Sequence, residues 1–491
     1  MMDHKLRLAH GLDIADLYRR DGLVRLDAEF LRHLKSRDAA LAARLQEARA
    51  RPEALSRGDE SGLFLALAPL VDDFVAELFC AGSENAALRR SQEELEVLFE
   101  CKRKFVQRAA PRLFKPEEVR GADGAALQSA LEAHLGEALS ELDFARKVMA
   151  WMADETAHAE SLAAAARYAV WASSTAAGRR LHGHGVLFRT TQKRAPLERV
   201  ATASESSGSG GRAITWLKAP PDQALRQRRG FALSDPGCDL AGGIAEIKYC
   251  ILCHHQGKDS CSTGMHEAAG GFKKNALGVA QVGCPLEERI SEMHEARGLG
   301  HAIAALGIIC VDNPMAAGTG HRICNDCMAA CIYQNKNHEP VNIPEAETRT
   351  LKDVLALPWG FEIYSLLTRW NPFNIRRPLP LPPSGRKVLV VGMGPAGYTL
   401  AHHLMNDGHM VVGIDGLKIE PLAATLCGRD ADGSPVPFAP VHDAAKLHEE
   451  LGERINAGFG GVAEYGITVR WDKNFLKVIR LLLERRPEFS L

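Results

Sequence analysis

The chain has 491 residues, of which 60 are basic and 61 acidic, so its formal net charge is -1. This balance excludes the basic surface that a nucleic acid or an anionic membrane attracts, and neither partner is expected. Charges at Asp3, Lys5, Arg7, Asp13 and Asp16 interrupt the N-terminal segment, which therefore predicts neither a secretory signal nor a membrane span. We expect a cytoplasmic protein of roughly three domains.

Residues 1–200 are predicted to form a helical bundle domain. Apolar residues recur there at helical spacing in one segment after another, for example between Gly62 and Phe79. Isolated polar residues such as His158 and Glu160 usually face solvent on such helices and do not indicate a metal site. The domain is therefore interpreted as a structural or docking unit.

Two changes of composition divide the rest of the chain. Residues 201–212 are rich in serine and glycine, which predicts a flexible linker. Residues 377–385, RPLPLPPSG, predict a stiff spacer because proline restricts the backbone. The units expected are a helical domain at 1–200, a helical cysteine-rich domain at 213–376 and a nucleotide-binding domain at 386–491.

Cysteines are concentrated in one part of the chain. Eight of the twelve lie between Cys250 and Cys331, where an even spread predicts only about two. Because C-x2-C turns place two sulfurs on one metal centre and distant cysteines complete the ligand set, the pattern favours iron–sulfur clusters. The seven candidate ligands are Cys250, Cys253, Cys261, Cys284, Cys324, Cys327 and Cys331.

A structural zinc site at the two C-x2-C pairs is the alternative, and it leaves three of these seven cysteines without a role. Cys310 lies in an apolar run and is expected to pack as a small hydrophobic residue. The adjacent His254 and His255 are expected to be solvated, with a tuning or ligand role as the other possibility.

A glycine-rich turn at Gly392, Gly394 and Gly397 follows the apolar run 388–391 directly. A helix is predicted after the turn, and then a second strand that ends at Asp415. In this context the glycines admit a pyrophosphate at the helix N-terminus, and Asp415 accepts a hydrogen bond from a ribose hydroxyl. The pattern predicts a dinucleotide site without choosing between FAD and NAD(P), and glycines that serve packing alone are the alternative.

The order of these motifs, with NPMAAGTGHRICNDCMAAC and EPVNIPEAE between them, resembles the small (beta) subunit of glutamate synthase and the N-terminal part of dihydropyrimidine dehydrogenase. The resemblance covers residues 250–473 and implies two interleaved [4Fe-4S] clusters. The ligands implied for one cluster are Cys250, Cys253, Cys261 and Cys331, and those for the other are Cys284, Cys324, Cys327 and Glu347.

The resemblance also implies that the glycine turn binds FAD. The residues that it assigns to this cofactor are Gly392, Gly394, Pro395, Ala396, Gly397, Asp415, Gly460, Gly461 and Arg470. The fold class that follows is multidomain: a mainly α N-terminal half, an α-helical iron–sulfur domain, and an incomplete α/β Rossmann-like FAD-binding domain.

The function that the resemblance implies is that of the electron-transfer module of an NAD(P)H-dependent oxidoreductase. Electrons would pass between FAD and the two clusters to an acceptor outside this chain, such as a large subunit. The NAD(P)H domain of the family does not follow Lys473, so a fragment or a completing partner chain is expected, and whether the chain is itself an enzyme stays open. The alternatives are a zinc-stabilised nucleotide-binding interaction protein and an inactive truncated remnant.

Overall fold

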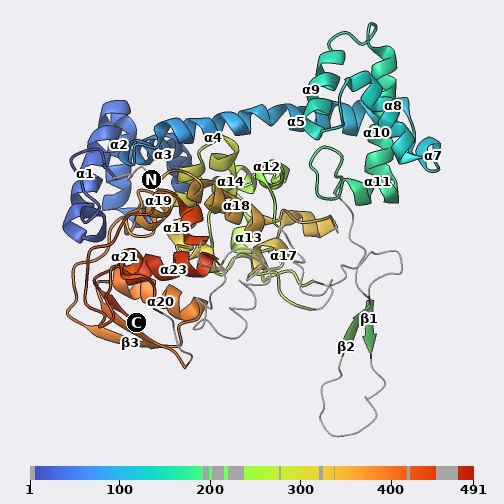
Figure 1. The fold of residues 1–491 in the computed structure, drawn as a ribbon. Coiled ribbons are helices and arrows are strands. Elements are labelled where there is room, and N and C mark those ends of the chain that lie inside the picture. Colours follow the sequence, from blue (N-terminus) through green and yellow to red (C-terminus); the bar gives the residue numbers. More distant parts are fainter. Residues whose placement is uncertain are drawn as a thin grey trace, which may run out of the picture. The chain divides into compact units, whose positions relative to one another are not determined.

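The computed structural model describes residues 6–191, 198–201, 215–218, 237–275, 278–319, 324–336, 338–416, 421–448 and 474–491 (Figure 1). It is mostly helical, at 59%. Two compact units are present, one made of Met1–Ala86, Lys193–Gly237 and Ile247–Leu491, and the other of Ala87–Gln192 and Cys238–Glu246. None of the described helices is long and apolar enough to cross a membrane.

The first unit begins with three helices, α1 (Arg20–Arg37), α2 (Ala39–Ala50) and α3 (Arg57–Leu78). Helix α3 starts with a capping box, in which the side chains of Ser56 and Asp59 each bond the backbone N–H of the other residue. Its buried face packs on α14 (Ile290–Gly298) and α15 (Ala302–Asp312). The buried Asp72 fixes this packing, because its Oδ1 accepts a hydrogen bond of 3.0 Å from the N–H of Ala304.

Short helices joined by loops build the cysteine-rich part of this unit. The bounds are η5 (Cys253–Gln256), α13 (Ser260–Thr263), α16 (Ala316–Thr319), α17 (Asp326–Ala329), η6 (Ile332–Lys336), α18 (Ile343–Leu355) and α19 (Gly360–Leu367). Of α12 (Leu240–Tyr249), residues 247–249 belong to this unit and the rest to the second. The longer helices α14, α15 and α18 pack on one another beneath these loops. Helix α15 is apolar on all sides and is buried almost throughout, as expected of a helix surrounded by others.

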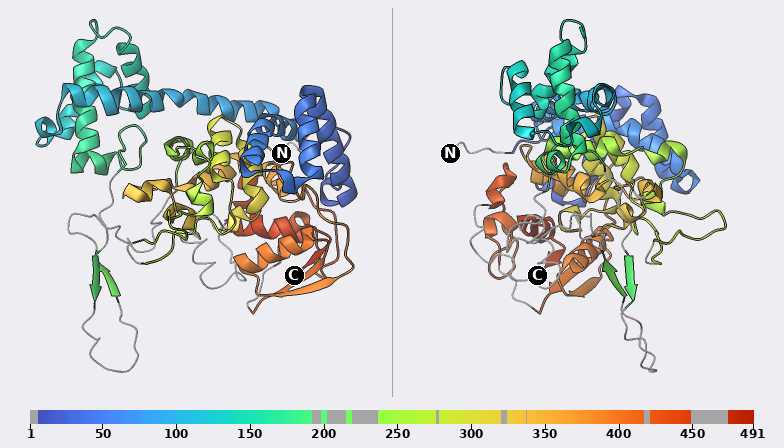
Figure 2. Two further views of the ribbon diagram at one scale, coloured as in Figure 1. Left: turned by 180° about the vertical axis from the view of Figure 1, so that it is seen from behind. Right: turned by 90° about the vertical axis from the view of Figure 1, so that its right-hand side faces the viewer.

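The C-terminal part of the unit holds a small parallel sheet in the order β3–β4–β5. The elements are β3 (Lys387–Val391), α20 (Pro395–Asn406), β4 (Met410–Ile414), α21 (Ala424–Cys427), η7 (Ala444–His448), α23 (Asn474–Glu484) and β5 (Phe489–Ser490). The orange helix α20 and the red helix α23 lie over the same side of the sheet (Figure 2). On the other side, apolar residues of β3 and β4 are exposed, most of all Val391 at 74%.

The predicted fold class, with an incomplete Rossmann-like FAD-binding domain, is wrong. In the described part of the chain the parallel sheet has three short strands, and no Rossmann-like FAD domain is evident. The glycine pattern specifies one strand, one turn and one helix, but the number of strands that assemble beside them depends on residues far away in the sequence. Here the last strand is only two residues long.

The predicted division of the chain at residues 201–212 and 377–385 stays a prediction. Residues 202–212 of the predicted linker lie outside the described residues. Near it, β1 (Glu198–Ala201) pairs antiparallel with β2 (Thr215–Lys218).

The second unit is a helical bundle around α10. Its elements are α5 (Glu96–Cys101), the π-helical stretch η3 (Lys102–Ala109), α6 (Ala110–Leu113), α7 (Pro116–Val119), α8 (Gly124–Leu135), α9 (Glu141–Trp151), α10 (Ala159–Ser174) and α11 (Ala176–Leu181). Phe144, Tyr168 and Phe188 form its aromatic centre, with edge-to-face contacts of 5.0 Å between Phe144 and Phe188 and 5.6 Å between Tyr168 and Phe188. Burial of these rings contributes to the stability of this unit.

Lys102 makes the stability of this second unit dependent on pH. Its Nζ donates a hydrogen bond of 2.7 Å to the Val186 carbonyl, and burial, reinforced by Arg189, lowers the pKa of Lys102 to about 8. Unfolding returns the ammonium to its ordinary pKa of about 10.4, so between these values the unfolded chain binds more protons and stability rises with pH. The contribution of Lys102 to stability is fully present above its pKa in the unfolded chain. It is lost as pH falls through about 8, the pKa of Lys102 in the folded chain.

We therefore expect Lys102→Met to flatten the rise in stability of this unit above neutral pH. The measurement is the urea midpoint of the wild-type and variant chains at a series of pH values, followed by the fluorescence of the tryptophans. The difference between the two proteins isolates the Lys102 contribution from other groups that titrate in the same range. Parallel curves for the two proteins would show that the Lys102 ammonium stays charged in the folded state.

Candidate metal centre

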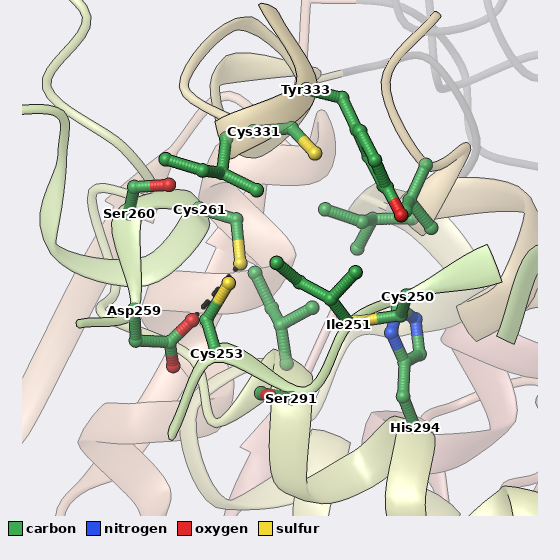
Figure 3. A pocket seen from close by; sticks show the side chains of 14 residues that line it. Cys250, Ile251, Cys253, Asp259, Ser260, Cys261, Ser291, His294, Cys331 and Tyr333 are labelled. Atoms are coloured by element: carbon green, nitrogen blue, oxygen red, sulfur yellow. Dashed lines mark hydrogen bonds between the residues drawn. The ribbon is translucent and has the colours of Figure 1, made fainter. Parts of the chain in front are cut away.

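Four of the predicted cysteine ligands line one pocket (Figure 3). Cys250 follows α12, Cys253 begins η5, Cys261 lies in α13, and Cys331 lies between α17 and η6. The other pocket walls are largely apolar and include isoleucine, valine and tyrosine side chains. The structure thus brings together four sulfurs from segments up to 81 positions apart, a group that we call the first cysteine group.

A backbone contact between two glycines explains how Cys261 and Cys284, which are far apart in the sequence, come together in the structure. The segment between them folds back on itself, and Cys284 N–H donates a hydrogen bond of 2.8 Å to the Cys261 carbonyl. Gly283 has a φ of +80°, and a Cβ there would lie 2.5 Å from the Gly264 nitrogen, so no other residue fits. The close approach places Cys261 and Cys284 side by side.

The second cysteine group contains Cys284, Cys324, Cys327 and Glu347, which interact electrostatically with one another. Cys327 lies in α17 and Glu347 in α18. Burial, then the Glu347 and Glu288 carboxylates, raises the pKa of Cys327 well above its usual range. Each group corresponds to one of the two ligand sets that the resemblance implied, and metal binding at either group stays a prediction.

Glu288 belongs beside the second cysteine group and was missed in the sequence. Burial raises the pKa of Glu288, and burial together with the Glu288 charge raises the pKa of Glu347 well above its usual range. A hydrogen bond joins the two side chains. Two buried carboxyl groups in contact cannot both ionise readily, so they hold a shared proton. The position of Glu288, four residues after Cys284, was the signal available in the sequence.

Burial favours the protonated thiol at several cysteines of the two groups. Burial raises the pKa of Cys250 and of Cys284 to about 12, and that of Cys253 to about 11. A metal ligand must be a thiolate, so binding releases these protons and the bond to metal replaces them.

His294 is a second residue that the sequence did not indicate. It lies in α14 on the wall of the pocket (Figure 3), with only 1% of its surface exposed. Neither ring nitrogen has a hydrogen-bond partner among the described residues. Burial lowers the pKa of His294 to about 4, so the ring is neutral and carries one N–H that can donate to an acceptor in the pocket. 

The glycine turn has the local geometry that the sequence predicted. Gly392 has a φ of +96°, and a Cβ on Gly397 would lie 1.9 Å from the Gly392 carbonyl oxygen, so both positions require glycine. The turn leads into α20 through Gly394, Pro395 and Ala396. Asp415 follows β4, and its Oδ2 accepts a hydrogen bond of 2.7 Å from Met393 N–H. Gly460, Gly461 and Arg470, also assigned to FAD, lie outside the described residues.

Comparison with known proteins overturns the resemblance to the glutamate synthase small subunit and to dihydropyrimidine dehydrogenase. It finds no oxidoreductase or iron–sulfur family. Cysteine and glycine motifs of a few residues can recur in unrelated chains, which is why they misled. No solved structure matches the chain.

The comparisons find similarity to two proteins of Rickettsia prowazekii. Residues 8–80 match the family model described as the RP005 N-terminal alpha-helical domain. The chain is 54% identical over 176 residues to the uncharacterized protein RP006, a match that covers 36% of this chain and only 23% of RP006. It is 29% identical over 305 residues to the uncharacterized protein RP005, covering 59% of this chain and 97% of RP005.

Proposed function

We propose that this chain is an electron-transfer protein that binds two [4Fe-4S] clusters, one at each cysteine group. The observation that carries the proposal is the arrangement of eight predicted ligands in two groups of four, one of them around a pocket. Such clusters, when bound, accept and return single electrons. The donor chemistry fits, because thiolates are the usual cluster ligands and one carboxylate, Glu347, completes the second set.

We propose a cluster rather than a single zinc ion for the pocket that the first four cysteines line. Zinc binds thiolates at about 2.3 Å, which draws four tetrahedral sulfurs to about 3.8 Å from one another and leaves no space between them. In a cluster each cysteine sulfur binds a different iron, so the ligands surround a core of iron and sulfide. The isoleucine and valine side chains on the pocket walls, Ile290, Val341 and Ile343, would keep water away from that core.

His294 and the link between the two groups support electron transfer. A neutral imidazole N–H aimed into the pocket can donate to a sulfur and so raise the reduction potential of the first site. The hydrogen bond from Cys284 to Cys261 gives a short path from one group to the other. Cysteines of both groups also share one buried apolar cluster, which excludes solvent between them.

The partners follow from the proposal. A one-electron carrier needs a donor and an acceptor, and we propose an electron-accepting protein outside this chain, in the cytoplasm, where clustered thiols stay reduced. FAD at the glycine turn, NAD(P)H as the source of electrons and a completing chain stay predictions on which the cluster proposal does not depend.

The test is the iron, acid-labile sulfide and zinc content of the chain purified without oxygen. We expect about eight iron and about eight sulfide per chain, with no more than about one zinc. One or two zinc ions with negligible iron would overturn the proposal and favour a zinc-stabilised protein. An electron paramagnetic resonance spectrum of the dithionite-reduced protein, with signals from two interacting clusters, would separate two bound clusters from iron bound at random.

A further inference from the structure

We propose that His254, His255 and Glu295 form a separate site for one divalent transition-metal ion. The two histidines lie in η5, and Glu295 lies in the facing helix α14. One ligand atom from each of the three residues lies within 4.8 Å of the others. None of the three belongs to either cysteine group, so the site does not rest on the proposed clusters.

The ligand atoms converge at ion-pair distances but without the geometry of a hydrogen bond. Glu295 Oε2 lies 3.0 Å from His254 Nε2 and 2.8 Å from His255 Nε2. Yet within the described part of the chain neither His254 Nε2 nor Glu295 Oε2 makes a hydrogen bond, although both atoms are shielded from solvent. Buried polar atoms without partners cost free energy, and an ion bound by all three side chains would remove that cost.

Ser291 orients the first of these histidines. Its hydroxyl lies 2.6 Å from His254 Nδ1, on the ring edge opposite the converging nitrogen. A hydrogen bond at one imidazole nitrogen fixes the ring and leaves the other nitrogen for the metal, which is the usual arrangement of metal-binding histidines. Only 7% of the His254 side chain is exposed, so the ring is held in place by its surroundings as well.

The donor set points to zinc or a neighbouring first-row metal. Two imidazoles with one carboxylate suit ions such as Zn²⁺ and Fe²⁺, whereas Mg²⁺ and Ca²⁺ prefer oxygen ligands alone. Three protein ligands leave the fourth position of a tetrahedral ion for water or a small molecule. The His255 side chain is 55% exposed, so the site can be reached from solvent.

The experiment is a titration of the full-length chain with Zn²⁺ against a chromophoric chelator. Wild-type protein is compared with Glu295→Gln, which keeps the shape of the side chain and removes its charge, and with Ser291→Ala. We expect Glu295→Gln to lose one zinc per chain or to bind it at least about tenfold more weakly, and Ser291→Ala to weaken it about tenfold. The control, His184→Asn, alters an exposed histidine of the second unit and should bind zinc as the wild type does.

A double variant, Cys261→Ala with Cys331→Ala, separates this site from zinc bound by cysteines. The proposal expects the double variant to keep the zinc that Glu295→Gln loses. The proposal would be overturned if the double cysteine variant lost zinc that Glu295→Gln kept. It would also be overturned if both proteins bound zinc as the wild type does. Failure of the cluster proposal is recorded separately, by the iron and sulfide content of the wild-type protein.

Discussion

Replacing Cys331 by alanine is expected to remove about four of about eight iron atoms and a similar share of sulfide from each chain. Cys331 shares its pocket with Cys250, Cys253 and Cys261, so its loss leaves one site with three thiolates. The second cysteine group does not include Cys331 and should keep its metal. The measurement is iron and sulfide per chain, with the reduced electron paramagnetic resonance spectrum to count the remaining clusters.

Pairs of variants test the grouping itself. Cys261→Ala combined with Cys331→Ala should lose no more iron than either single variant, because both residues belong to the same group. Cys327→Ala combined with Cys331→Ala should lose nearly all of it. Cys80→Ala is the control, since this cysteine is exposed and belongs to neither group. Equal losses from the two double variants would contradict the assignment of Cys327 and Cys331 to different sites.

Replacing Arg485 by methionine is expected to destabilise the first unit by about 3–5 kcal/mol, because it leaves a buried carboxylate without its counter-ion. Arg485 Nη1 donates a hydrogen bond of 2.7 Å to Glu362 Oε1, and the two side chains are 0% and 1% exposed. The guanidinium also lies 4.4 Å from the centre of the Phe438 ring. Its other nitrogens donate to the carbonyls of Leu426 and Ala439, which the variant would also leave without donors.

The double variant Arg485→Met with Glu362→Leu provides the matched comparison. Removing both charges should recover the part of the loss that comes from the unpaired carboxylate, because an apolar pair of similar volume needs no counter-ion. Arg51→Met breaks an exposed pair with Glu47 and should cost no more than about 0.5 kcal/mol. Thermal melting of the four proteins gives the comparison. A loss in Arg485→Met as small as that in Arg51→Met would mean that water reaches Glu362.

The local elements were predictable from the sequence because their signals lie within a few residues. The strand expected at 388–391 is β3 (Lys387–Val391), and the helix expected after the glycine turn is α20 (Pro395–Asn406). The helix expected between Gly62 and Phe79 lies within α3 and the residue after it. Apolar spacing and glycine positions are enough to specify such segments.

The architecture was not predictable in the same way. The fold class failed because the sheet beside β3 and β4 depends on β5, about 75 residues further on, which carries no strand signal of its own. The site was predictable in part, because a concentration of cysteines in the sequence indicates metal binding whatever the fold of the chain. Glu288 and His294 were missed. The position of Glu288, four residues after Cys284, was an available signal, whereas a single buried imidazole such as His294 has no recognisable spacing.

His254 and His255 show how distance in the sequence hides a site. The expectation that both are solvated is wrong for His254, of which only 7% is exposed. Two adjacent histidines carry no periodic pattern. Their partners at the proposed site lie far away in the sequence: Ser291 is 37 positions after His254, and Glu295 is 40 positions after His255. Only the packing of η5 on α14 brings these side chains together.

The order of the two cysteine groups along the chain has a consequence for biosynthesis. The first group opens at Cys250 and closes at Cys331, and the second opens at Cys284 and closes at Glu347, so each begins before the other is complete. During translation the ligands of neither group can all leave the ribosome before the first ligand of the other group has done so. If the two groups bind clusters as proposed, a nascent chain that stalls before Cys331 has no complete ligand set to offer for cluster assembly.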